Sequence, residues 1–519
     1  MLRDPPTPRI APVTREPVRE RLAGRTILLT GASGFLGKAV LSTLMRTAPE
    51  IREVRLLLRA GSDEDAHRRL VEEVLAADAF AGVGGGRDHL DPARLRALPG
   101  DLGGHAVAAP SRSDWAGVDV VVHCAATVSF EEPLDDAIAL NSHGPARLLE
   151  HLLEAGSRPH FVHVSTAYVA DRRSGLVLED GVTHQAVAGL DTDRLEAEAG
   201  ERREQVERES GDDALLSGFA REARRDASLR PGLDAEERAE ELRRRWVSTR
   251  LSREGRRRAQ ELGWPDTYAL SKALGEKVLT ERAAGRAKVT IVRPTIIESA
   301  LRTPRPGWLE GIKVADPLIL AYAARGLTHL PGDAANRIDI VPVDQVANAC
   351  VAAAAHPPEG DLRSIAVASS SRNPLAIGEL AEQIRTYFLA HPLPGRNGRP
   401  VKIGHLKFVE RRAALAPTVR REKLAAALAT AAIRSPIRIP QERMLRGNRT
   451  LAERVTRMVK IYGAYTELDC LFDDANARRL GESLHEDDRA LLSFDTAAID
   501  WDDYLQTVHL PEVRRLATA

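Results

Sequence analysis

Tyr268 and Lys272 are the residues whose types and spacing first suggest chemistry, in the segment Tyr268-Ala-Leu-Ser-Lys272. On a helix, positions i and i+4 share one face, so the phenol and the ammonium lie side by side. A free tyrosine has a pKa of about 10 and exchanges protons poorly at neutral pH. A neighbouring ammonium and the positive ring of an oxidised hydride carrier lower that pKa. We therefore predict that Tyr268 is a general acid for a carbonyl oxygen, and that Lys272 also holds the carrier's ribose.

Three further polar residues accompany this pair. Ser165 and Thr166 follow a short apolar run, and a hydroxyl at that point can donate to an oxyanion that develops on a carbonyl. Asn141 begins a helical pattern and is predicted to orient Lys272 through a water molecule. A Tyr-x-x-x-Lys spacing is common by chance on surface helices, so the spacing alone does not indicate catalysis. The prediction depends on the elements that position these residues.

A glycine-rich turn is the first of those elements. It follows an apolar run, opens a helical pattern and has the spacing GxxGxxG. Glycine lets the backbone turn tightly and approach a pyrophosphate, which binds at the N-terminus of the helix. We predict a dinucleotide site there, with contacts from Thr30, Gly31, Ser33, Gly34, Phe35, Leu36 and Gly37.

Later segments complete the predicted dinucleotide site. The second strand ends in Arg59 instead of Asp or Glu, which favours the 2′-phosphate of NADP over the ribose hydroxyl of NAD. A solvated arginine at a strand end is the alternative interpretation. Asp101 and Leu102 are placed to border the adenine. Small residues after the next apolar strand let the dinucleotide lie close, and the predicted contacts there are Ala125, Ala126 and Thr127.

The fold follows from short apolar runs that alternate with helical patterns. Apolar strands separated by helices are typical of a parallel sheet covered on both faces, and right-handed crossovers then give a doubly wound Rossmann fold. We thus predict an α/β class, with a charged helical insertion and a second, mostly helical C-terminal domain. The predicted strands are 26–30, 54–58, 118–123, 160–164, 288–293 and 338–342.

The chain length of 519 residues predicts more than one domain. Residues 1–24 are rich in Pro and Arg, lack the apolar run of a signal peptide, and are predicted to be a flexible tail. The Rossmann domain is placed at 25–357, with the insertion at about 185–263, and the helical domain at 358–519. Arginine runs within the insertion are expected to be solvated helix faces, with CoA phosphates as the less favoured partner.

Composition narrows the function classes. Lys plus Arg and Asp plus Glu are equal at 74 each, which gives no reason to expect a nucleic-acid partner. The three cysteines form no CxxC pair, so we predict neither a metal site nor disulfides, and a reducing, cytoplasmic compartment. No segment reaches the roughly 18 apolar residues of a membrane span, so any membrane contact is expected to be peripheral.

Together, the motifs resemble those of the extended short-chain dehydrogenase/reductases. Within that superfamily the chain looks like bacterial alcohol-forming fatty acyl-CoA reductases, whose NAD-binding domain is of the male-sterility type. The resemblance covers about residues 26–355 and, less distinctively, the C-terminal segment around 461–467. It rests on Leu56–Arg59, Gly31–Gly37, His123–Phe130, His163–Val169, Val292–Ile296, Pro306–Trp308 and Asp339–Asp344.

This resemblance implies roles for individual residues. Thr166, Tyr268 and Lys272 would be the catalytic hydroxyl, acid and lysine, with Thr166 aligning better than Ser165 although either could serve. Pro294, Thr295 and Ile296 would line the nicotinamide. The 102 positions between Thr166 and Tyr268 exceed those of typical relatives, so the insertion is expected to pack outside the site and shape its entrance.

The implied reaction is NADPH-dependent reduction of long-chain fatty acyl-CoA to fatty alcohol, as in lipid metabolism and wax ester biosynthesis. Two hydride transfers would pass through a bound aldehyde and release CoA. The acyl chain needs an apolar tunnel, expected between the sheet and the helical domain. Its predicted lining, with ordinary core packing as the even alternative, is Trp308, Leu309, Ile312 and Leu318–Tyr322.

Alternative functions stay open at this point. Reduction could stop at the aldehyde, or the chain could be a hydroxysteroid dehydrogenase, a carrier-protein thioester reductase, or a non-catalytic NADP-binding regulator. Pro306-Gly-Trp308 and the long C-terminal segment argue against the steroid enzyme. A carrier-protein reductase normally adjoins a carrier or adenylation domain, for which the chain has no room. Tyr268 and Lys272 argue against a regulator.

Overall fold

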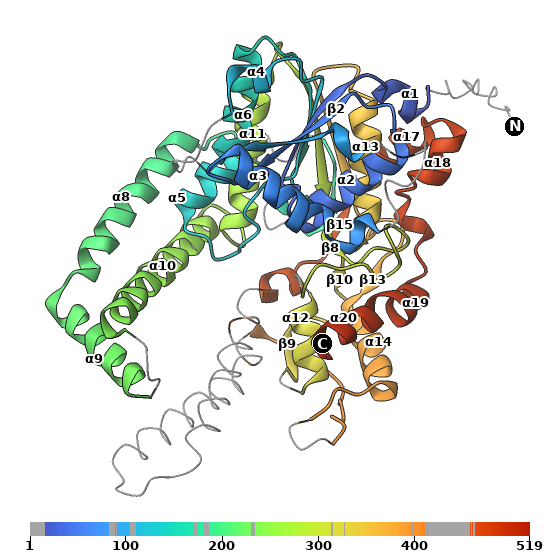
Figure 1. Ribbon diagram of the computed structural model, residues 1–519. Coiled ribbons are helices and arrows are strands. Elements are labelled where there is room, and N and C mark those ends of the chain that lie inside the picture. The colour runs from blue at the N-terminus through green and yellow to red at the C-terminus, as the bar shows by residue number, and fades with distance from the viewer. Residues whose placement is uncertain are drawn as a thin grey trace, which may run out of the picture.

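A seven-stranded parallel sheet lies at the centre of the protein, with helices on both faces (Figure 1). The computed structural model describes residues 16–518 apart from 82–88, 90, 104–109, 171–173, 181–185, 230–233, 313–314, 326, 396–398, 412, 414–456, 458 and 460–461. The strand order is β12-β7-β5-β4-β1-β2-β3. The chain reverses its direction across the sheet between β1 and β4, which in a doubly wound fold is where a nucleotide binds. The predicted Rossmann class is confirmed.

Most strands of the sheet were predicted to within two residues. The exceptions are β3, whose short segment Leu95-Arg-Ala-Leu-Pro99 has no clear apolar period, and β12, which lies beyond the predicted domain boundary. All neighbouring strands run parallel. The strands are β1 Thr26–Thr30, β2 Glu53–Leu58, β3 Leu95–Pro99, β4 Val120–His123, β5 His160–Val164, β7 Lys288–Pro294 and β12 Leu362–Val367.

Alternate side chains of each strand enter two separate apolar cores. In β1, Ile27 and Leu29 pack on one side of the sheet and Leu28 on the other, and all three are fully buried. This double burial is why the strands have near-continuous apolar sequences. One core includes α1 Val18–Leu22, α2 Phe35–Thr47, α13 Val343–Ala355 and α17 Ala475–Glu482, and the other α4 Arg112–Trp115, α6 Gly144–Glu154 and α11 Thr267–Ala283.

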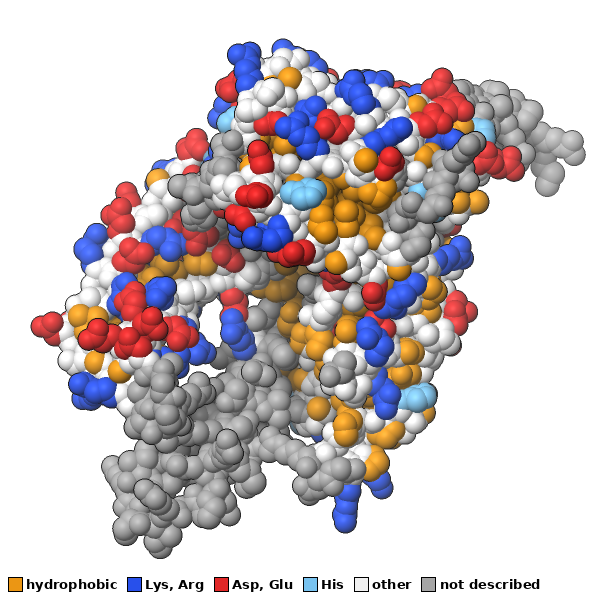
Figure 2. Space-filling model, in the orientation of Figure 1, with side chains coloured by type: hydrophobic (Ala, Val, Ile, Leu, Met, Phe, Trp, Pro, Cys, Tyr) orange, Lys and Arg blue, Asp and Glu red, His pale blue; other side chains and the backbone are white. Residues whose placement is uncertain are grey.

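The predicted charged helical insertion forms an arm that projects from the sheet (Figure 1). It consists of α8 Thr192–Ser210, α9 Asp213–Leu229 and α10 Ala235–Glu261, and it packs on the short helix α5 Leu134–Ala137. Figure 2 shows acidic and basic side chains interspersed over this arm. Arg243 pairs with Glu240 at 2.8 Å and Arg258 with Glu198 at 3.3 Å, so the structure supports the interpretation as solvated, salt-bridged faces.

The segment after residue 357 is interleaved with the sheet. Its first strand, β12, extends the seven-stranded sheet past the predicted boundary by pairing with β7. Its strand β15 Cys470–Phe472 pairs with β6 Gly175–Val177. The remaining α-helices among the described residues are α3 Asp63–Arg69, α12 Asp316–Ala323, α14 Ile377–Ala390, α18 Glu486–Leu491, α19 Trp501–Asp503 and α20 Leu510–Thr518.

Short strand pairs and π-helical turns connect these elements. The predicted strand at 338–342 is split at Asp339 and lies outside the main sheet. The short strands are β8 Ile296–Glu298, β9 His329–Pro331, β10 Arg337–Ile338, β11 Ile340–Pro342, β13 Leu375–Ala376 and β14 Lys407–Val409. The π-helical turns are Leu70–Leu75, Ile138–His143 and Tyr504–His509.

The predicted flexible tail at 1–24 is corrected in its second half. Residues 1–15 lie outside the described part of the chain, but α1 is ordered against the core. Val18 and Leu22, one helical turn apart, are 0% and 1% exposed, and the amide of Val18 donates to Asp488 at 2.8 Å. Burial of this apolar pair outweighs the Pro- and Arg-rich composition of its surroundings. Among the described helices, none has the length and apolar character needed to cross a membrane.

A buried ion pair joins β7 to α11. Arg293 donates to Glu276 from Nε at 2.9 Å and from Nη2 at 2.7 Å, and the two side chains are 6% and 1% exposed. Arg293 also donates to the Glu179 carbonyl at 2.6 Å. The pair thus fixes the strand that leads into Pro294 against the helix that carries Tyr268.

We predict that Arg293→Met lowers the free energy of unfolding by about 3–5 kcal/mol, because Glu276 is left buried and unpaired. Urea denaturation followed by circular dichroism measures this change. Arg286→Met is the matched control, because its pair with Glu150 is 2.8 Å long but 45% and 29% exposed. That control is expected to cost less than about 1 kcal/mol. Equal losses in the two variants would contradict the role given to the buried pair.

Candidate active site

The residues predicted for the site converge on the carboxyl edge of the sheet. Gly31 follows β1, Arg59 follows β2 and Asp101 lies two residues after β3. Ser165 and Thr166 follow β5 directly. In open α/β sheets ligands bind in the crevice outside this edge, so the fold gathers the predicted side chains where a dinucleotide would lie.

The glycine turn has the geometry that was predicted from its sequence. Gly31 has φ +72°, and a Cβ at that position would lie 2.7 Å from the amide nitrogen of Ala125. A Cβ at Gly37 would lie 2.0 Å from the carbonyl oxygen of Gly31. Gly34 is the N-cap of α2 and bonds to the Gly31 carbonyl at 2.9 Å. The turn therefore presents a helix N-terminus close to the backbone after β4, which suits a bound pyrophosphate.

The other residues predicted from this turn differ in their surroundings. Ser33 is exposed, and Phe35 and Leu36 are half-buried. Phe35 packs on Trp308 with 4.9 Å between ring centroids. Thr30 is fully buried and lies beneath the turn, where its hydroxyl bonds to His123 Nδ1 at 2.8 Å and to the Ala125 amide at 3.2 Å. Its hydroxyl therefore supports the turn, and only its backbone is left for a ligand.

Arg59 is free to reach a phosphate at the end of β2. Its side chain is 68% exposed, and its Nε lies 3.8 Å from Asp101 Oδ1. Asp101 also accepts a bond from the Gly103 amide at 3.0 Å, and Leu102 beside it is half-buried. The long Arg59–Asp101 contact in solvent is weak, so the guanidinium could turn to a ligand at little cost.

The segment after β4 is tied to the helix that carries the predicted acid. Asn141 donates to the Thr127 carbonyl and to Ser271 Oγ, both at 3.0 Å, and accepts from the Thr127 amide at 2.9 Å. These bonds use the π-helical turn 138–143 where a regular helix was predicted. Asn141 thus fixes Thr127, together with half-buried Ala125 and Ala126, against α11. The predicted water between Asn141 and Lys272 stays a prediction.

Lys272 is buried against the end of β5. Its Nζ donates to the Val164 carbonyl at 2.9 Å, and the residue is 2% exposed. Burial lowers the pKa of Lys272 to about 8. The ammonium in turn helps lower the pKa values of His123 and His163, although burial is their main cause. A positive charge is therefore held where a nicotinamide ribose would approach.

Tyr268 lies one helical turn before Lys272 and is hydrogen-bonded to Thr166. Burial raises the pKa of Tyr268 to about 12, and the bond to Thr166 opposes that rise. The expected lowering by Lys272 is therefore wrong for the protein without cofactor, because desolvation of the phenolate dominates. Tyr268 is protonated at neutral pH, which suits a group that must donate a proton.

The two candidate hydroxyls differ in their contacts. Thr166 Oγ1 bonds to Tyr268, accepts from the Tyr168 amide at 3.3 Å and lies 3.4 Å from the Pro294 carbonyl. Ser165 Oγ is buried and has no hydrogen-bond partner among the residues that the structure describes. Only Thr166 is joined to the phenol, which supports the preference for Thr166 drawn from the sequence.

The segment that was expected to line the nicotinamide closes the site at the end of β7. Pro294 is its last residue and is buried, and Ile296 is half-buried. Thr295 is 5% exposed and donates to Asp339 Oδ1 at 2.8 Å, so its hydroxyl is used inside the protein. Asp339, which lies between β10 and β11, thus supplies the carboxylate that accepts the hydrogen bond from Thr295.

An aromatic cluster beside Tyr268 was missed from the sequence. Phe130 packs edge-on against Tyr268 at 5.6 Å and against Tyr462 at 5.6 Å, and lies 5.3 Å from Tyr465. Tyr465 also packs on Tyr168 at 4.9 Å. In a chain with 4% aromatic residues this cluster is notable, and it brings the C-terminal segment to the predicted acid. The resemblance around residues 461–467 was the one available signal, and it assigned no role.

Asp266 links that cluster to the start of α11. As the N-cap it accepts from the Ala269 amide at 2.9 Å, and its other oxygen accepts from Tyr465 Oη at 2.6 Å. Burial raises the pKa of Asp266 to about 6, and the bond to Tyr465 opposes the rise. Asp266, two positions before Tyr268, was also missed, although an aspartate before a helix is a known capping signal.

The predicted acyl tunnel is not supported by these residues. Trp308, Leu309, Ile319 and Tyr322 are at most 5% exposed and belong to the apolar cores, and Ile312 is 44% exposed. The hydroxyl of Tyr322 donates to the Gly404 carbonyl at 2.7 Å. Leu318, Leu320 and Ala321 pack on the same core. The alternative of ordinary core packing therefore describes this set.

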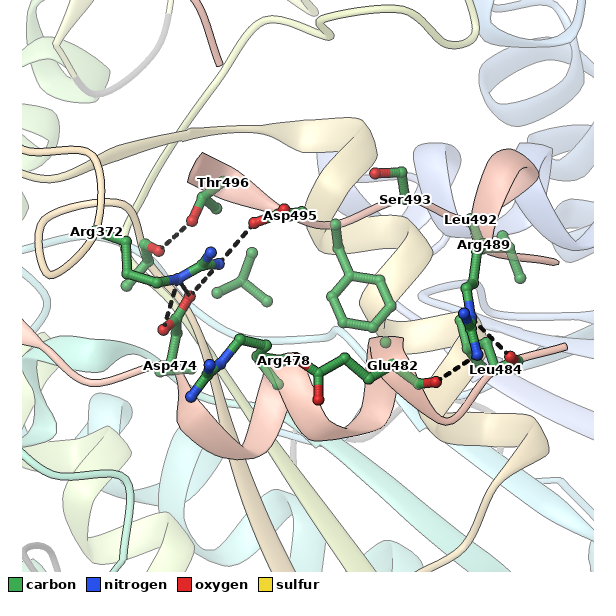
Figure 3. Close-up of a pocket in the computed structure, with 16 residues that line it drawn as sticks. Arg372, Asp474, Arg478, Glu482, Leu484, Arg489, Leu492, Ser493, Asp495 and Thr496 are labelled. Atoms are coloured by element: carbon green, nitrogen blue, oxygen red, sulfur yellow. Dashed lines mark hydrogen bonds and ion pairs between the residues drawn. The ribbon is translucent and has the colours of Figure 1, made fainter. Parts of the chain in front are cut away.

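A pocket of about 450 Å³ lies away from the site, next to the edge strand β12. Figure 3 shows Arg372, Asp474 and Asp495 at one end and Arg489 at the other. Arg372 pairs with both carboxylates at 2.7 Å, and Arg489 donates to the Leu484 carbonyl at 2.9 Å. The guanidinium groups of Arg372 and Arg489 therefore already have partners within the protein.

Comparison with known proteins agrees with this geometry. The family described as male sterility protein matches residues 29–350 with its NAD-binding part and residues 437–516 with its sterile part. Fatty acyl-CoA reductase 1 of Arabidopsis thaliana is 30% identical over 514 residues, which are 94% of this chain and 96% of that protein. The chain belongs to the male sterility and fatty acyl-CoA reductase family. It therefore carries an NAD(P)-binding domain.

A further relative and two solved structures complete the comparison. The alcohol-forming fatty acyl-CoA reductase of Simmondsia chinensis is 29% identical, over 96% of this chain and 98% of its own. The terminal R domain of the myxalamid pathway aligns with TM-score 0.57 and 17% identity, over 96% and 92% of the two chains. A peptide synthetase reductase domain from Mycobacterium tuberculosis gives 0.50 and 19%, over 98% and 93%. At these identities the two structures support the fold alone. The two relatives are plant proteins, so the likeness to bacterial members stays a prediction.

We predict that Tyr465→Phe destabilises the protein by about 1–3 kcal/mol at pH 7.5, because the buried Asp266 carboxylate loses a donor. The loss should be smaller at pH 5. In the folded protein the pKa of Asp266 is raised to about 6 from 3.8, so Asp266 is mostly protonated at pH 5 and mostly ionised at pH 7.5. Ionisation of this buried carboxyl group costs stability as the pH rises between these two values. Thermal unfolding at the two pH values checks the difference. Tyr387→Phe, which alters a buried tyrosine in α14, is the control. A loss that is independent of pH would contradict the link to Asp266.

Proposed function

We propose that the protein is an alcohol-forming, NADPH-dependent reductase of long-chain fatty acyl-CoA. The observation that carries this proposal is the hydrogen-bonded pair Thr166–Tyr268 beside the buried ammonium of Lys272 and the glycine turn. Similarity to fatty acyl-CoA reductases along nearly the whole chain supports the choice of substrate class.

The cofactor's part would be to supply hydride to the thioester carbonyl. Gly31, Gly34 and Gly37 fit a pyrophosphate at the N-terminus of α2. Arg59 fits a 2′-phosphate, since it is an exposed guanidinium at the end of β2 with no acidic residue in its place. Lys272 would hold the nicotinamide ribose, and Pro294 and Ile296 would bound the ring.

Tyr268 and Thr166 would act on the substrate oxygen. As hydride reaches the carbonyl carbon, negative charge develops on that oxygen, and the two hydroxyls would donate to it. The tetrahedral product is a hemithioacetal, which collapses when its carbon–sulfur bond breaks. CoA leaves as the thiol and the aldehyde remains. No cysteine nucleophile is needed, because thiolate is already a good leaving group.

A second hydride equivalent would reduce the aldehyde to the alcohol at the same site. Tyr268 would then donate its proton to the alkoxide, and Lys272 would favour the resulting phenolate. Each acyl-CoA therefore consumes two NADPH and two protons and yields one alcohol and one CoA thiol. An enzyme that released the aldehyde would consume only one NADPH.

The arm α8–α10 contacts the loop that carries Phe130. Ser252 of α10 donates to the Glu131 carbonyl, and Arg256 pairs with the Glu131 side chain at 3.4 Å. Glu131 follows Phe130, which packs on Tyr268. The insertion thereby supports the loop beside the acid. We further propose a cytoplasmic location, in keeping with three free cysteines.

Product analysis tests the reaction. With palmitoyl-CoA in excess, we expect hexadecanol by gas chromatography, two NADPH consumed per CoA released, and little free aldehyde. Tyr268→Phe should lower kcat by about 10²- to 10⁴-fold, because the general acid is lost. Tyr387→Phe should leave kcat unchanged. A ratio of one NADPH per CoA would overturn alcohol formation, and full turnover by Tyr268→Phe would remove the assigned acid.

We also predict that Arg59→Ala raises the KM for NADPH by about 10- to 100-fold, because a charge-assisted bond to the 2′-phosphate is lost. The KM for NADH should change less than about threefold, because NADH has no such phosphate. Initial rates with the two cofactors give both constants. Arg68→Ala, in the exposed helix α3, is the control. Arg55→Ala cannot serve, because Arg55 donates to the backbone carbonyls of Asp114 and Ala116. Equal KM changes for both cofactors would reject the phosphate contact.

A further inference from the structure

Glu298, Asp316 and His509 meet inside the protein, outside the catalytic group. Glu298 ends β8, Asp316 begins α12, and His509 ends the π-helical turn 504–509. They are 1%, 0% and 1% exposed. One possible ligand atom from each lies within 4.8 Å of the others. His509 Nε2 lies 3.5 Å from Asp316 Oδ1 and 3.9 Å from Glu298 Oε2.

This cluster carries two carboxyl groups in a dry environment. Burial, and then the charge of Asp316, raise the pKa of Glu298 well above its ordinary value, with the Ala315 amide opposing them. Burial also lowers the pKa of His509 to about 4, so the imidazole is neutral. Neither oxygen of Glu298 has a well-formed hydrogen bond with the described residues. A buried carboxylate without such bonds is costly unless a cation or a proton joins it.

The imidazole of His509 is held by its other nitrogen. Nδ1 lies 3.1 Å from Ser299 Oγ, and Tyr504 donates to the Ser299 carbonyl at 2.8 Å. The ring of Tyr504 also stacks on the His509 ring, with centroids 5.8 Å apart. Metal-bound histidines typically bond their second nitrogen to an oxygen in this way, which aims the first at the ion. Nε2 accordingly faces the two carboxyl groups.

We propose that Glu298, Asp316 and His509 bind one divalent transition-metal ion of the Zn²⁺ or Mn²⁺ class. Both oxygens of Glu298, one of Asp316 and Nε2 of His509 supply four donors. Metal–ligand distances of about 2.0–2.2 Å place neighbouring donors roughly 3.3 Å apart, so donor atoms that lie within 4.8 Å of one another need to approach by at most about 1.5 Å. No local motif in the sequence indicates this site, because the three ligands are spread over 211 positions.

The ion would join three parts of the chain. Glu298 lies four residues after Pro294, which bounds the candidate nicotinamide site, and His509 precedes α20. Asp316 starts the helix α12, which belongs to the second apolar core. Metal binding would therefore fix the C-terminal helices against the nucleotide-binding part, as a structural ion and without a role in hydride transfer.

Metal content and thermal stability test the site independently of turnover. We expect purified full-length protein to hold about one ion per chain by elemental mass spectrometry. After treatment with EDTA and its removal, adding ZnCl₂ or MnCl₂ should raise Tm by about 2–6 °C at a hundredfold excess over Kd. Protein without metal, and with no Tm change for either ion, would overturn the proposal while leaving the proposed reductase activity untouched.

Two variants separate a metal ion from a shared proton. Glu298→Gln should reduce the metal content at least tenfold and abolish the metal-dependent rise in Tm. Glutamine has the shape of a protonated glutamic acid, so a variant that matches the parent in both measurements would overturn the proposal. His405→Asn, which removes an exposed histidine beside Glu382, is the control and should retain the ion. If Glu298→Gln fails to fold, the EDTA and metal-addition experiment on the parent protein decides.

Discussion

The bond from Lys272 to the carbonyl of Val164 is the contact on which the site depends. It brings a buried ammonium to the end of β5, at 2.9 Å. An unpaired ammonium in that position would be expensive, so the bond fixes the register of α11 against the sheet. Tyr268, one helical turn earlier, is thereby placed beside Thr166, the second residue after β5. The phenol and the ammonium thus lie one helical turn apart, as their spacing in the sequence predicts. The phenol bonds to Thr166, whereas the ammonium bonds to the Val164 carbonyl.

Other contacts make this position rigid before any ligand binds. Arg293 and Glu276 join β7 to α11 from one side, and Asn141 joins the segment after β4 from another. The side chains of Asn141 and Thr295 already make hydrogen bonds within the protein. Groups that remain available to a ligand include the backbone at the glycine turn, the exposed guanidinium of Arg59, and the hydroxyls of Tyr268 and Thr166. Preorganisation of this kind is how a protein contributes to hydride chemistry that a cofactor carries out.

The features that could be predicted from the sequence are those with local signals. Strands β1, β2, β5 and β7 have apolar runs, and Gly31 and Gly37 are needed for close backbone approach. The features that could not be predicted depend on residues distant in the chain. Nothing near Leu362–Val367 indicates that this strand joins β7, and nothing near Tyr465 indicates that it bonds to Asp266. The pKa of Tyr268 was misjudged because its spacing from Lys272 does not reveal the burial that raises that pKa.

The C-terminal segment is therefore part of the site and not an appendage to it. Tyr465 donates to the N-cap carboxylate of α11, and this bond opposes the rise in the pKa of Asp266. The charge of Asp266 in turn helps to raise the pKa of Tyr268. A change in the position of Tyr465 would thus alter both the start of the catalytic helix and the field at its phenol. Since β12 pairs with β7 and β15 pairs with β6, the segment after residue 357 also takes part in the same sheets as the nucleotide-binding part. Similarity to the reductase family likewise extends along nearly the whole chain instead of stopping at the nucleotide-binding part.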